Sequence, residues 1–220
     1  MFRQIPNITK NLLIINVLAF IASYVLRGQG VVLNELLGLH FVMAEDFRIY
    51  QLLTYMFMHA NLSHIFCNMF ALWMFGPVIE NEWGSKRFAL YYLVCGLGAA
   101  ITQEVVWALM GGSVGVTIGA SGAVFGILFA FGWLFPDVPM FLFFIPIPIR
   151  ARVFVTLYAA FELFAGLAPT TGDNVAHFAH LGGMLFGWLL ILCWKHIKFN
   201  KKPKISKKDY STYHYHPKID

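Results

Sequence analysis

The stretch Gly119-Ala120-Ser121-Gly122-Ala123-Val124-Phe125-Gly126 is the part of the sequence on which the interpretation of the rest depends. It is a run of small residues that leads directly into an apolar segment ending at Phe135. A serine between glycines at the mouth of a hydrophobic helix serves either as a close-packing surface or as a nucleophile that another group must approach. The neighbouring segments have to distinguish these two interpretations.

The composition excludes an ordinary soluble domain. Of the 220 residues, 59% are hydrophobic and only 12% are charged. A helix needs about 20 mostly apolar residues to cross the bilayer core, and six stretches approach that length: 11–28, 62–80, 88–110, 118–135, 152–168 and 175–194. We therefore expect an all-α, polytopic membrane protein with six transmembrane helices.

The basic residues predict the orientation of these helices. If both termini are cytoplasmic, only Arg27 and Arg48 of the 16 lysines and arginines lie on the outer side, and cytoplasmic flanks do retain positive charge. The chain then divides into a cytoplasmic lead at 1–10, a membrane domain at 11–197 with a long outer loop at 27–61, and a basic cytoplasmic tail at 198–220. This loop is apolar enough that we expect it to fold partly into the membrane interface.

The positive net charge does not indicate a nucleic-acid partner. Most of the excess of +5 comes from lysines after Trp194. Basic residues just inside a membrane hold the topology and contact anionic lipids. We therefore expect the lipid bilayer, and no nucleic acid, as a partner.

Polar residues in two of the spans are candidates for function. His64 and Asn68 are four residues apart, so they share one helix face. Polar groups at membrane depth either join helices by hydrogen bonds or face a wet, functional cavity. In the sixth span, His180 precedes Gly183 by three residues, on the face where Gly183 and Gly187 allow another helix to approach.

These residues include the groups that acyl transfer needs. Ser121 and His180 are predicted at similar depth, roughly 5 to 10 Å below the outer surface, and Gly119 and Gly122 let the serine backbone approach the sixth span. A hydroxyl nucleophile, an imidazole base and side-chain donors for an oxyanion are then available. Glu162 in the fifth span is expected only as a bonding partner within the bundle. No carboxylate is obviously placed to orient the histidine, so we infer a Ser-His dyad whose third member is absent or supplied otherwise.

Three motifs together resemble those of rhomboid intramembrane serine proteases: Gly119-Ala120-Ser121-Gly122, Ala179-His180-x-x-Gly183-x-x-x-Gly187 and His64-x-x-x-Asn68. The resemblance runs from about Tyr50 to Trp194. It implies a six-helix rhomboid core, with Ser121 as nucleophile and His180 as general base. It also implies an oxyanion hole made by His64, Asn68 and the backbone amide of Ser121. The implied substrates are single-pass transmembrane proteins, cut near the outer membrane face.

Two features depart from the family pattern. Tyr50-Gln51 stands where the family often has a Trp-Arg pair in the first outer loop, which concerns loop packing more than catalysis. His177 lies one turn before His180 and is the alternative base. We prefer His180 because only it has glycines three and seven residues later.

Two other functions remain open at this point. A catalytically silent relative would bind membrane segments without cutting them. A metal site or transporter could use His59, His64, His177 and His180, although no carboxylate lies close to them in the sequence. We expect no metal and no cofactor, and we expect a multi-pass protein of the bacterial inner membrane.

Overall fold

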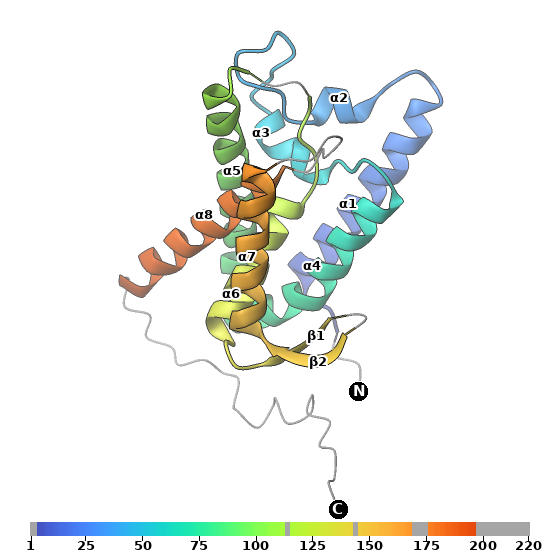
Figure 1. Cartoon of the computed structure of the whole chain (residues 1–220). Helices are drawn as coiled ribbons and strands as arrows, with labels where there is room; N and C mark the ends of the chain where they lie inside the picture. Colours follow the sequence, from blue (N-terminus) through green and yellow to red (C-terminus); the bar gives the residue numbers. More distant parts are fainter. Residues whose placement is uncertain (1–3, 113–114, 143–144, 169–175, 197–220) are drawn as a thin grey trace, which may run out of the picture.

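The structure, a computed structural model, describes residues 4–112, 115–142, 145–168 and 176–196. The segment 169–174, between the fifth and sixth predicted spans, and the basic tail at 198–220 lie outside these residues. Four of the described helices are long and apolar enough to cross a membrane: α1 (Asn7–Arg27), α4 (Leu62–Trp83), α5 (Ser85–Leu109) and α8 (His177–His196). Two helices, α6 (Ser121–Leu134) and α7 (Ala151–Leu167), are shorter. The chain is therefore a mostly helical polytopic membrane protein (Figure 1).

The first helix begins earlier than predicted because a distant side chain completes its first turn. Pro6 precedes the helix and offers no side-chain cap. Instead, the carboxylate of Glu80 on α4 accepts hydrogen bonds from the backbone N–H groups of Ile8 and Thr9, at 3.0 and 2.7 Å, and from the Thr9 hydroxyl. The same carboxylate accepts a bond from Ser85 Oγ at the start of α5. Glu80 thus joins the ends of three helices.

Glycines set two other helix boundaries. Gly84, with φ +80°, ends α4 and allows α5 to begin at the next residue. Gly119, with φ +122°, bends the chain so that α6 begins at Ser121 instead of residue 118. The predicted nucleophile therefore stands at the first residue of its helix, not one turn inside it.

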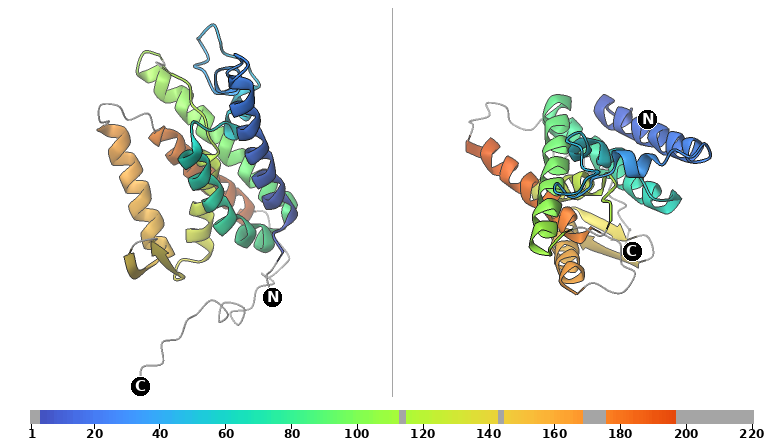
Figure 2. Two further views of the ribbon diagram at one scale, coloured as in Figure 1. Left: turned by 90° about the vertical axis from the view of Figure 1, so that its right-hand side faces the viewer. Right: turned by 90° about the horizontal axis from the view of Figure 1, so that it is seen from above.

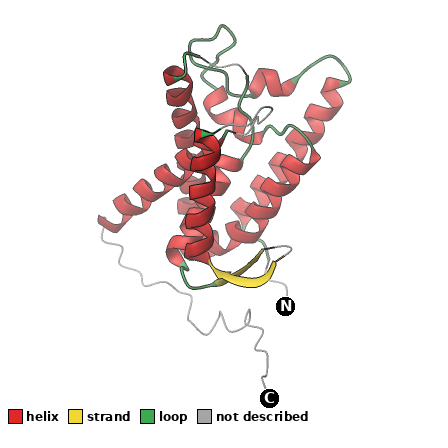
Figure 3. Cartoon of the chain, viewed as in Figure 1, coloured by secondary structure: helices red, strands yellow, loops and turns green. Residues whose placement is uncertain are grey.

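A β-hairpin follows α6, in a proline-containing segment between two of the predicted spans. Strands β1 (Pro139–Leu142) and β2 (Ile145–Arg150) pair antiparallel, with Pro139 opposite Arg150 (Figure 3). Prolines disfavour a helix but are compatible with the extended backbone of a two-stranded ribbon, where N–H groups that face outward need no partner. The chain stays consistent with the expected all-α class, and this hairpin is the one sheet among the described residues.

The long loop after α1 contains short helices and contacts the segment that precedes Ser121. It holds α2 (Leu33–Leu37), α3 (Gln51–Thr54) and the 3-10 turn η1 (Tyr55–Phe57). Leu39 pairs with Thr117 through two backbone hydrogen bonds, and the Gly119 N–H donates to the Tyr55 carbonyl at 2.9 Å. The loop and the β-hairpin lie at opposite ends of the molecule (Figure 1).

Helix α6 is the centre of the helical bundle. It packs against α4, α5, α7 and α8, and ten of its 14 residues are buried. Seen from above, α1 and α8 extend toward opposite sides of the molecule (Figure 2). The short central helix therefore brings Ser121 into the interior, within reach of side chains from its neighbours.

Candidate active site

The structure places Ser121 and His180 in direct contact, although 59 residues separate them in the chain. His180 Nε2 lies 2.8 Å from Ser121 Oγ. His180 is in the first turn of α8 and is 8% exposed, and Ser121 is partly buried. A hydrogen bond of this length between an imidazole and a hydroxyl has the geometry of a base beside its nucleophile.

One glycine makes the close approach of α6 and α8 possible. A Cβ atom on Gly183 would overlap the backbone carbonyl of Gly122, so only glycine fits at this crossing. Gly122 lies at the same crossing, and a Cβ on it would meet Ala99 on α5 and come within 3.4 Å of the Ala179 carbonyl on α8. A Cβ on Gly187 would meet Tyr91, which is also on α5. Helices α6 and α8 thus pack against each other and both pack against α5.

An aromatic ring fixes the plane of His180. The ring of Phe125 stacks on the imidazole, with centroids 4.3 Å apart and an interplanar angle of 7°. Phe125 lies four residues after Ser121 on α6, so both residues face α8. The stacking restricts the imidazole to a plane in which Nε2 faces the serine.

A carboxylate lies behind the imidazole, contrary to the expectation from the sequence. Glu162 Oε2 on α7 is 2.8 Å from His180 Nδ1 and 2.7 Å from His177 Nδ1. Glu162 is 3% exposed. Spacing along the chain could not reveal this contact, because 18 residues separate Glu162 from His180. The one available signal was the presence of an acid within an apolar span, which is expensive unless the acid is paired.

His64 and Asn68 lie on the first two turns of α4, and His64 shares the space around Gly119 with Ser121. Asn61 caps this helix through a hydrogen bond from the His64 N–H to Oδ1 at 2.9 Å. His64 Nδ1 accepts from the Ala60 N–H at 3.4 Å, which leaves Nε2 as the protonated nitrogen of the neutral ring. A Cβ on Gly119 would be 2.7 Å from that Nε2. Asn68 Nδ2 donates to the His64 carbonyl at 3.0 Å.

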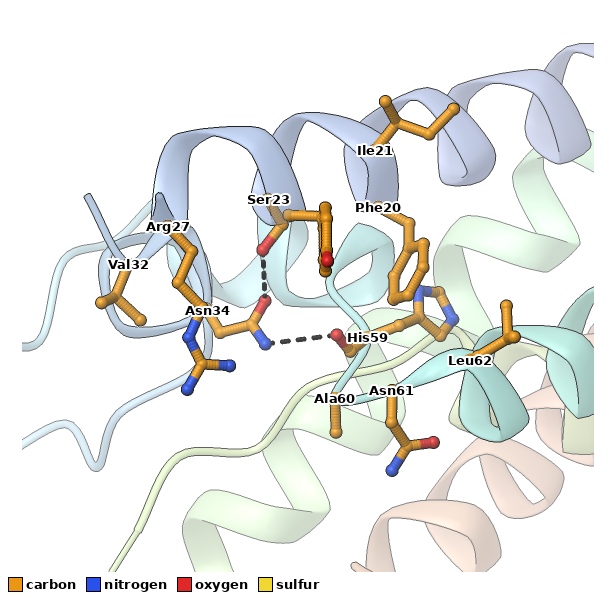
Figure 4. Close-up of a pocket in the computed structure, with 11 residues that line it drawn as sticks. Phe20, Ile21, Ser23, Arg27, Val32, Asn34, His59, Ala60, Asn61 and Leu62 are labelled. Carbon is orange, nitrogen blue, oxygen red and sulfur yellow. Dashed lines mark hydrogen bonds between the residues drawn. The ribbon is translucent and has the colours of Figure 1, made fainter. Parts of the chain in front are cut away.

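His59 supports His64 from outside the helix and borders a separate hollow. Its ring packs edge-on against His64, with centroids 5.0 Å apart, and burial together with that neighbour lowers the pKa of His59 to about 4. The hollow, of about 560 Å³, lies between α1, the outer loop and the start of α4. Asn34 bridges it by bonds to Ser23 and to the His59 carbonyl (Figure 4). Ser121 and His180 do not line it.

The histidines considered as metal ligands fall into two groups. Glu162, His177 and His180 each offer one ligand atom, and these three atoms lie within 4.8 Å of one another. A carboxylate with two imidazoles is a set that zinc accepts. No carboxylate lies close to these histidines in the sequence, but the fold brings Glu162 to His177 and His180 from 15 and 18 residues away. His59 and His64 are not part of this group.

The fold and the site together define a polytopic helical membrane protein with a buried Ser-His pair. The Rhomboid domain family matches residues 46–196 of the chain. The chain belongs to the rhomboid family, which confirms the resemblance seen in its motifs.

Relatives from plants, yeast and mammals agree with this assignment. "Rhomboid-like protein 11, chloroplastic" of Arabidopsis thaliana is 34% identical over 160 residues, which are 68% of this chain and 53% of the relative. "Rhomboid protein 1, mitochondrial" of Saccharomyces cerevisiae is 34% identical over 139 residues, 61% of this chain and 40% of the relative. "Presenilin-associated rhomboid-like protein, mitochondrial" of Rattus norvegicus is 31% identical over 160 residues, 68% and 39% respectively.

The chain thus spans about half or less of the length of these relatives. The names of these relatives refer to the chloroplast and the mitochondrion, so they do not support the expected location in the bacterial inner membrane. The apolar helices do support an integral membrane protein.

Proposed function

We propose that this protein is an intramembrane serine endopeptidase that cleaves single-pass transmembrane proteins near the outer membrane face. The observation that carries the proposal is the 2.8 Å contact between Ser121 Oγ and His180 Nε2 within a buried, membrane-embedded bundle. Membership of the rhomboid family supports it. The six-span count and the cytoplasmic location of both termini are part of the proposal.

The first half of the reaction forms an acyl-enzyme. Ser121 Oγ attacks the carbonyl carbon of the scissile peptide bond, and its proton moves to His180 Nε2. The tetrahedral intermediate then collapses. The C–N bond breaks, and the imidazolium gives its proton to the departing amine. In the second half, His180 takes a proton from water as the water attacks the ester carbon. The bond from that carbon to Ser121 Oγ then breaks, His180 returns the proton to Oγ, and the second product leaves.

Three donors are positioned to stabilise the negative charge of the tetrahedral intermediate. His64 Nε2–H lies beside Gly119. Asn68 uses one of its two amide hydrogens on the His64 carbonyl and keeps the other available. Ser121 stands at the N-terminus of α6, where the first backbone N–H groups have no partner within the helix and the helix dipole favours an anion. Each well-placed donor of this kind contributes about 10² to 10³ in kcat.

Replacing either member of the pair tests the proposal. We expect Ser121→Ala and His180→Ala to abolish cleavage of a transmembrane substrate in proteoliposomes, measured by gel. Thermal unfolding in detergent checks that both variants are folded. His177→Ala tests the alternative base: we expect measurable cleavage to remain, whereas a loss equal to that of His180→Ala would assign the base to His177. Full activity of either Ser121→Ala or His180→Ala in a folded protein contradicts the proposal.

Two observations favour alternative functions that the experiments must test. Several relatives are named only as rhomboid-like, so a silent, segment-binding protein is the second candidate. A fluorophosphonate that labels Ser121 in the wild type excludes it. The three-ligand group of Glu162, His177 and His180 favours a metal function. Cleavage that survives a chelator, together with metal analysis of the purified protein, decides against that function.

Experiments in cells are needed to identify the membrane in which the protein resides and its natural substrates. The bacterial inner membrane stays a prediction, which fractionation of the source cells tests directly. Comparison of membrane proteomes with the wild-type chain and with Ser121→Ala identifies substrates as ectodomains whose release depends on the serine.

A further inference from the structure

We propose that Glu162 is a positioning residue for His180, so that this chain carries out its proposed reaction with a Ser121-His180-Glu162 triad in place of a dyad. The inference rests on the proposed protease function and deepens it. It stands on the two hydrogen bonds that Glu162 Oε2 makes, at 2.8 Å to His180 Nδ1 and 2.7 Å to His177 Nδ1.

The first step of the argument concerns the tautomer of His180. An ionised carboxylate only accepts hydrogen bonds, so His180 Nδ1 must carry a hydrogen and donate it. The neutral ring then has its lone pair on Nε2, the nitrogen that lies 2.8 Å from Ser121 Oγ. Glu162 therefore selects the form of the imidazole that can accept the serine proton, which is the role of the carboxylate in a serine protease triad.

The second step concerns the charge that forms during the reaction. When Ser121 transfers its proton, His180 becomes an imidazolium in a site that is nearly closed to water. An ionised carboxylate 2.8 Å away stabilises that cation, because the local dielectric is low. Phe125 covers one face of the ring and offers no charge. Glu162 is thus the group that stabilises the charged form of the base.

The third step concerns how the carboxylate is held. Glu162 comes from α7, whose neighbours are α6, α8 and the β-hairpin. Gly166, one turn further along α7, lies so close to α8 that an added Cβ would be 3.0 Å from Phe178 and 3.3 Å from His177. The face of α7 that carries the Glu162 carboxylate is therefore also the face on which Gly166 lets α8 come close. His177 supplies a second donor to the same oxygen and fixes its position.

Other polar and titratable groups around this cluster come from four elements. Tyr158 on α7 lies one turn before Glu162, and its ring packs against Phe125. His177 and His180 are on α8, and Ser121 is on α6. On α4, His64 interacts electrostatically with His180, and Cys67 does so with Tyr158. Glu162 is the one carboxylate among the described residues that contacts His180.

The test is Glu162→Gln in the full-length protein, with kinetics measured in proteoliposomes. The amide side chain loses the charge, and its NH₂ group can donate to Nδ1 and so favour the wrong tautomer. We expect kcat to fall by 10²- to 10⁴-fold, on the order of the loss from the corresponding change in a Ser-His-Asp triad, with KM unchanged. Glu162→Asp keeps the charge and should restore part of kcat.

Glu104→Gln is the matched control. It removes a partly buried carboxylate from another span, one that accepts from the Val42 N–H and lies outside the site. We expect it to leave kcat and KM unchanged. If folded Glu162→Gln keeps wild-type kcat, the inference is overturned while the protease proposal stands. If Ser121→Ala still cleaves, the protease proposal itself fails.

Discussion

Gly119 controls the relation between Ser121 and His64. Its φ of +122° is a conformation that side-chain-bearing residues rarely adopt, and it allows α6 to begin at Ser121. The space where a Cβ would stand is taken by the imidazole of His64, whose Nε2 would be 2.7 Å away. One glycine therefore satisfies a backbone requirement and leaves room for a proposed oxyanion donor.

We expect Gly119→Ala to lower kcat more strongly than it lowers the stability of the fold. The added methyl group displaces His64 Nε2, so kcat should fall on the order of 10²-fold, and backbone strain should cost about 1–3 kcal/mol. Gly112→Ala is the control, because Gly112 has a similar φ of +126° and no atom of the described residues lies within 4 Å of the added Cβ. Cleavage kinetics and thermal unfolding compare the two variants. Equal kcat values would contradict the role given to His64.

At the scale of single residues, the sequence predicted those site residues that are marked by the spacing of their near neighbours in the chain. Glycines three and seven residues after His180 distinguished it from His177, and the four-residue spacing joined His64 to Asn68. Glu162 was not predicted as a partner of His180, because its contact depends on how α7 packs against α8. Gly187 was assigned to the wrong neighbour for the same reason: spacing shows which helix face is small but not which helix will cover it.

At the scale of elements, Glu80 joins the start of α1 to α4 and α5. We expect Glu80→Gln to lower the melting temperature, because one charged acceptor now serves four donors. Hydrogen bonds to a charged group contribute about 1.5–3 kcal/mol, and each kcal/mol corresponds to about 2–4 °C for a domain of this size.

Glu82→Gln is the control for this change. Glu82 lies on the same helix, but its Oε2 makes no hydrogen bond among the described residues. Thermal unfolding in detergent measures both variants, and cleavage per folded molecule should be unchanged in both. A larger loss for Glu82→Gln would show that the position on α4, and not the capping of α1, matters.

The elements that were predicted correctly are those that apolar length defines. The helices α1, α4, α5 and α8 were expected near their observed positions because a long apolar run has few alternatives in a membrane. The start of α1, the start of α6 and the β-hairpin were missed. Each depends on a contact or a backbone angle, namely the Glu80 cap, the φ of Gly119 and the pairing of two proline-containing strands.

At the scale of the whole molecule, the orientation is a prediction that labelling can test. With Cys67, Cys95 and Cys193 replaced by alanine, Gln29→Cys lies in the predicted outer loop and Lys86→Cys on the predicted cytoplasmic side. We expect a membrane-impermeant maleimide to label Gln29→Cys in sealed cells and Lys86→Cys only after lysis. Both positions are exposed in the structure. The reverse pattern would invert the topology and place Ser121 near the cytoplasmic face.

The bonds that Glu80 makes to α1 also bear on the order in which the chain matures. Ile8 and Thr9 precede Glu80 by 72 and 71 residues, so a ribosome completes and releases α1 to the membrane well before it synthesises the acceptor. During that interval the first turn of α1 depends on water or lipid headgroups for its N–H groups. The hydrogen bonds of this turn to Glu80 form only when α4 has been inserted. The first helix to be synthesised is therefore among the last to have its end capped.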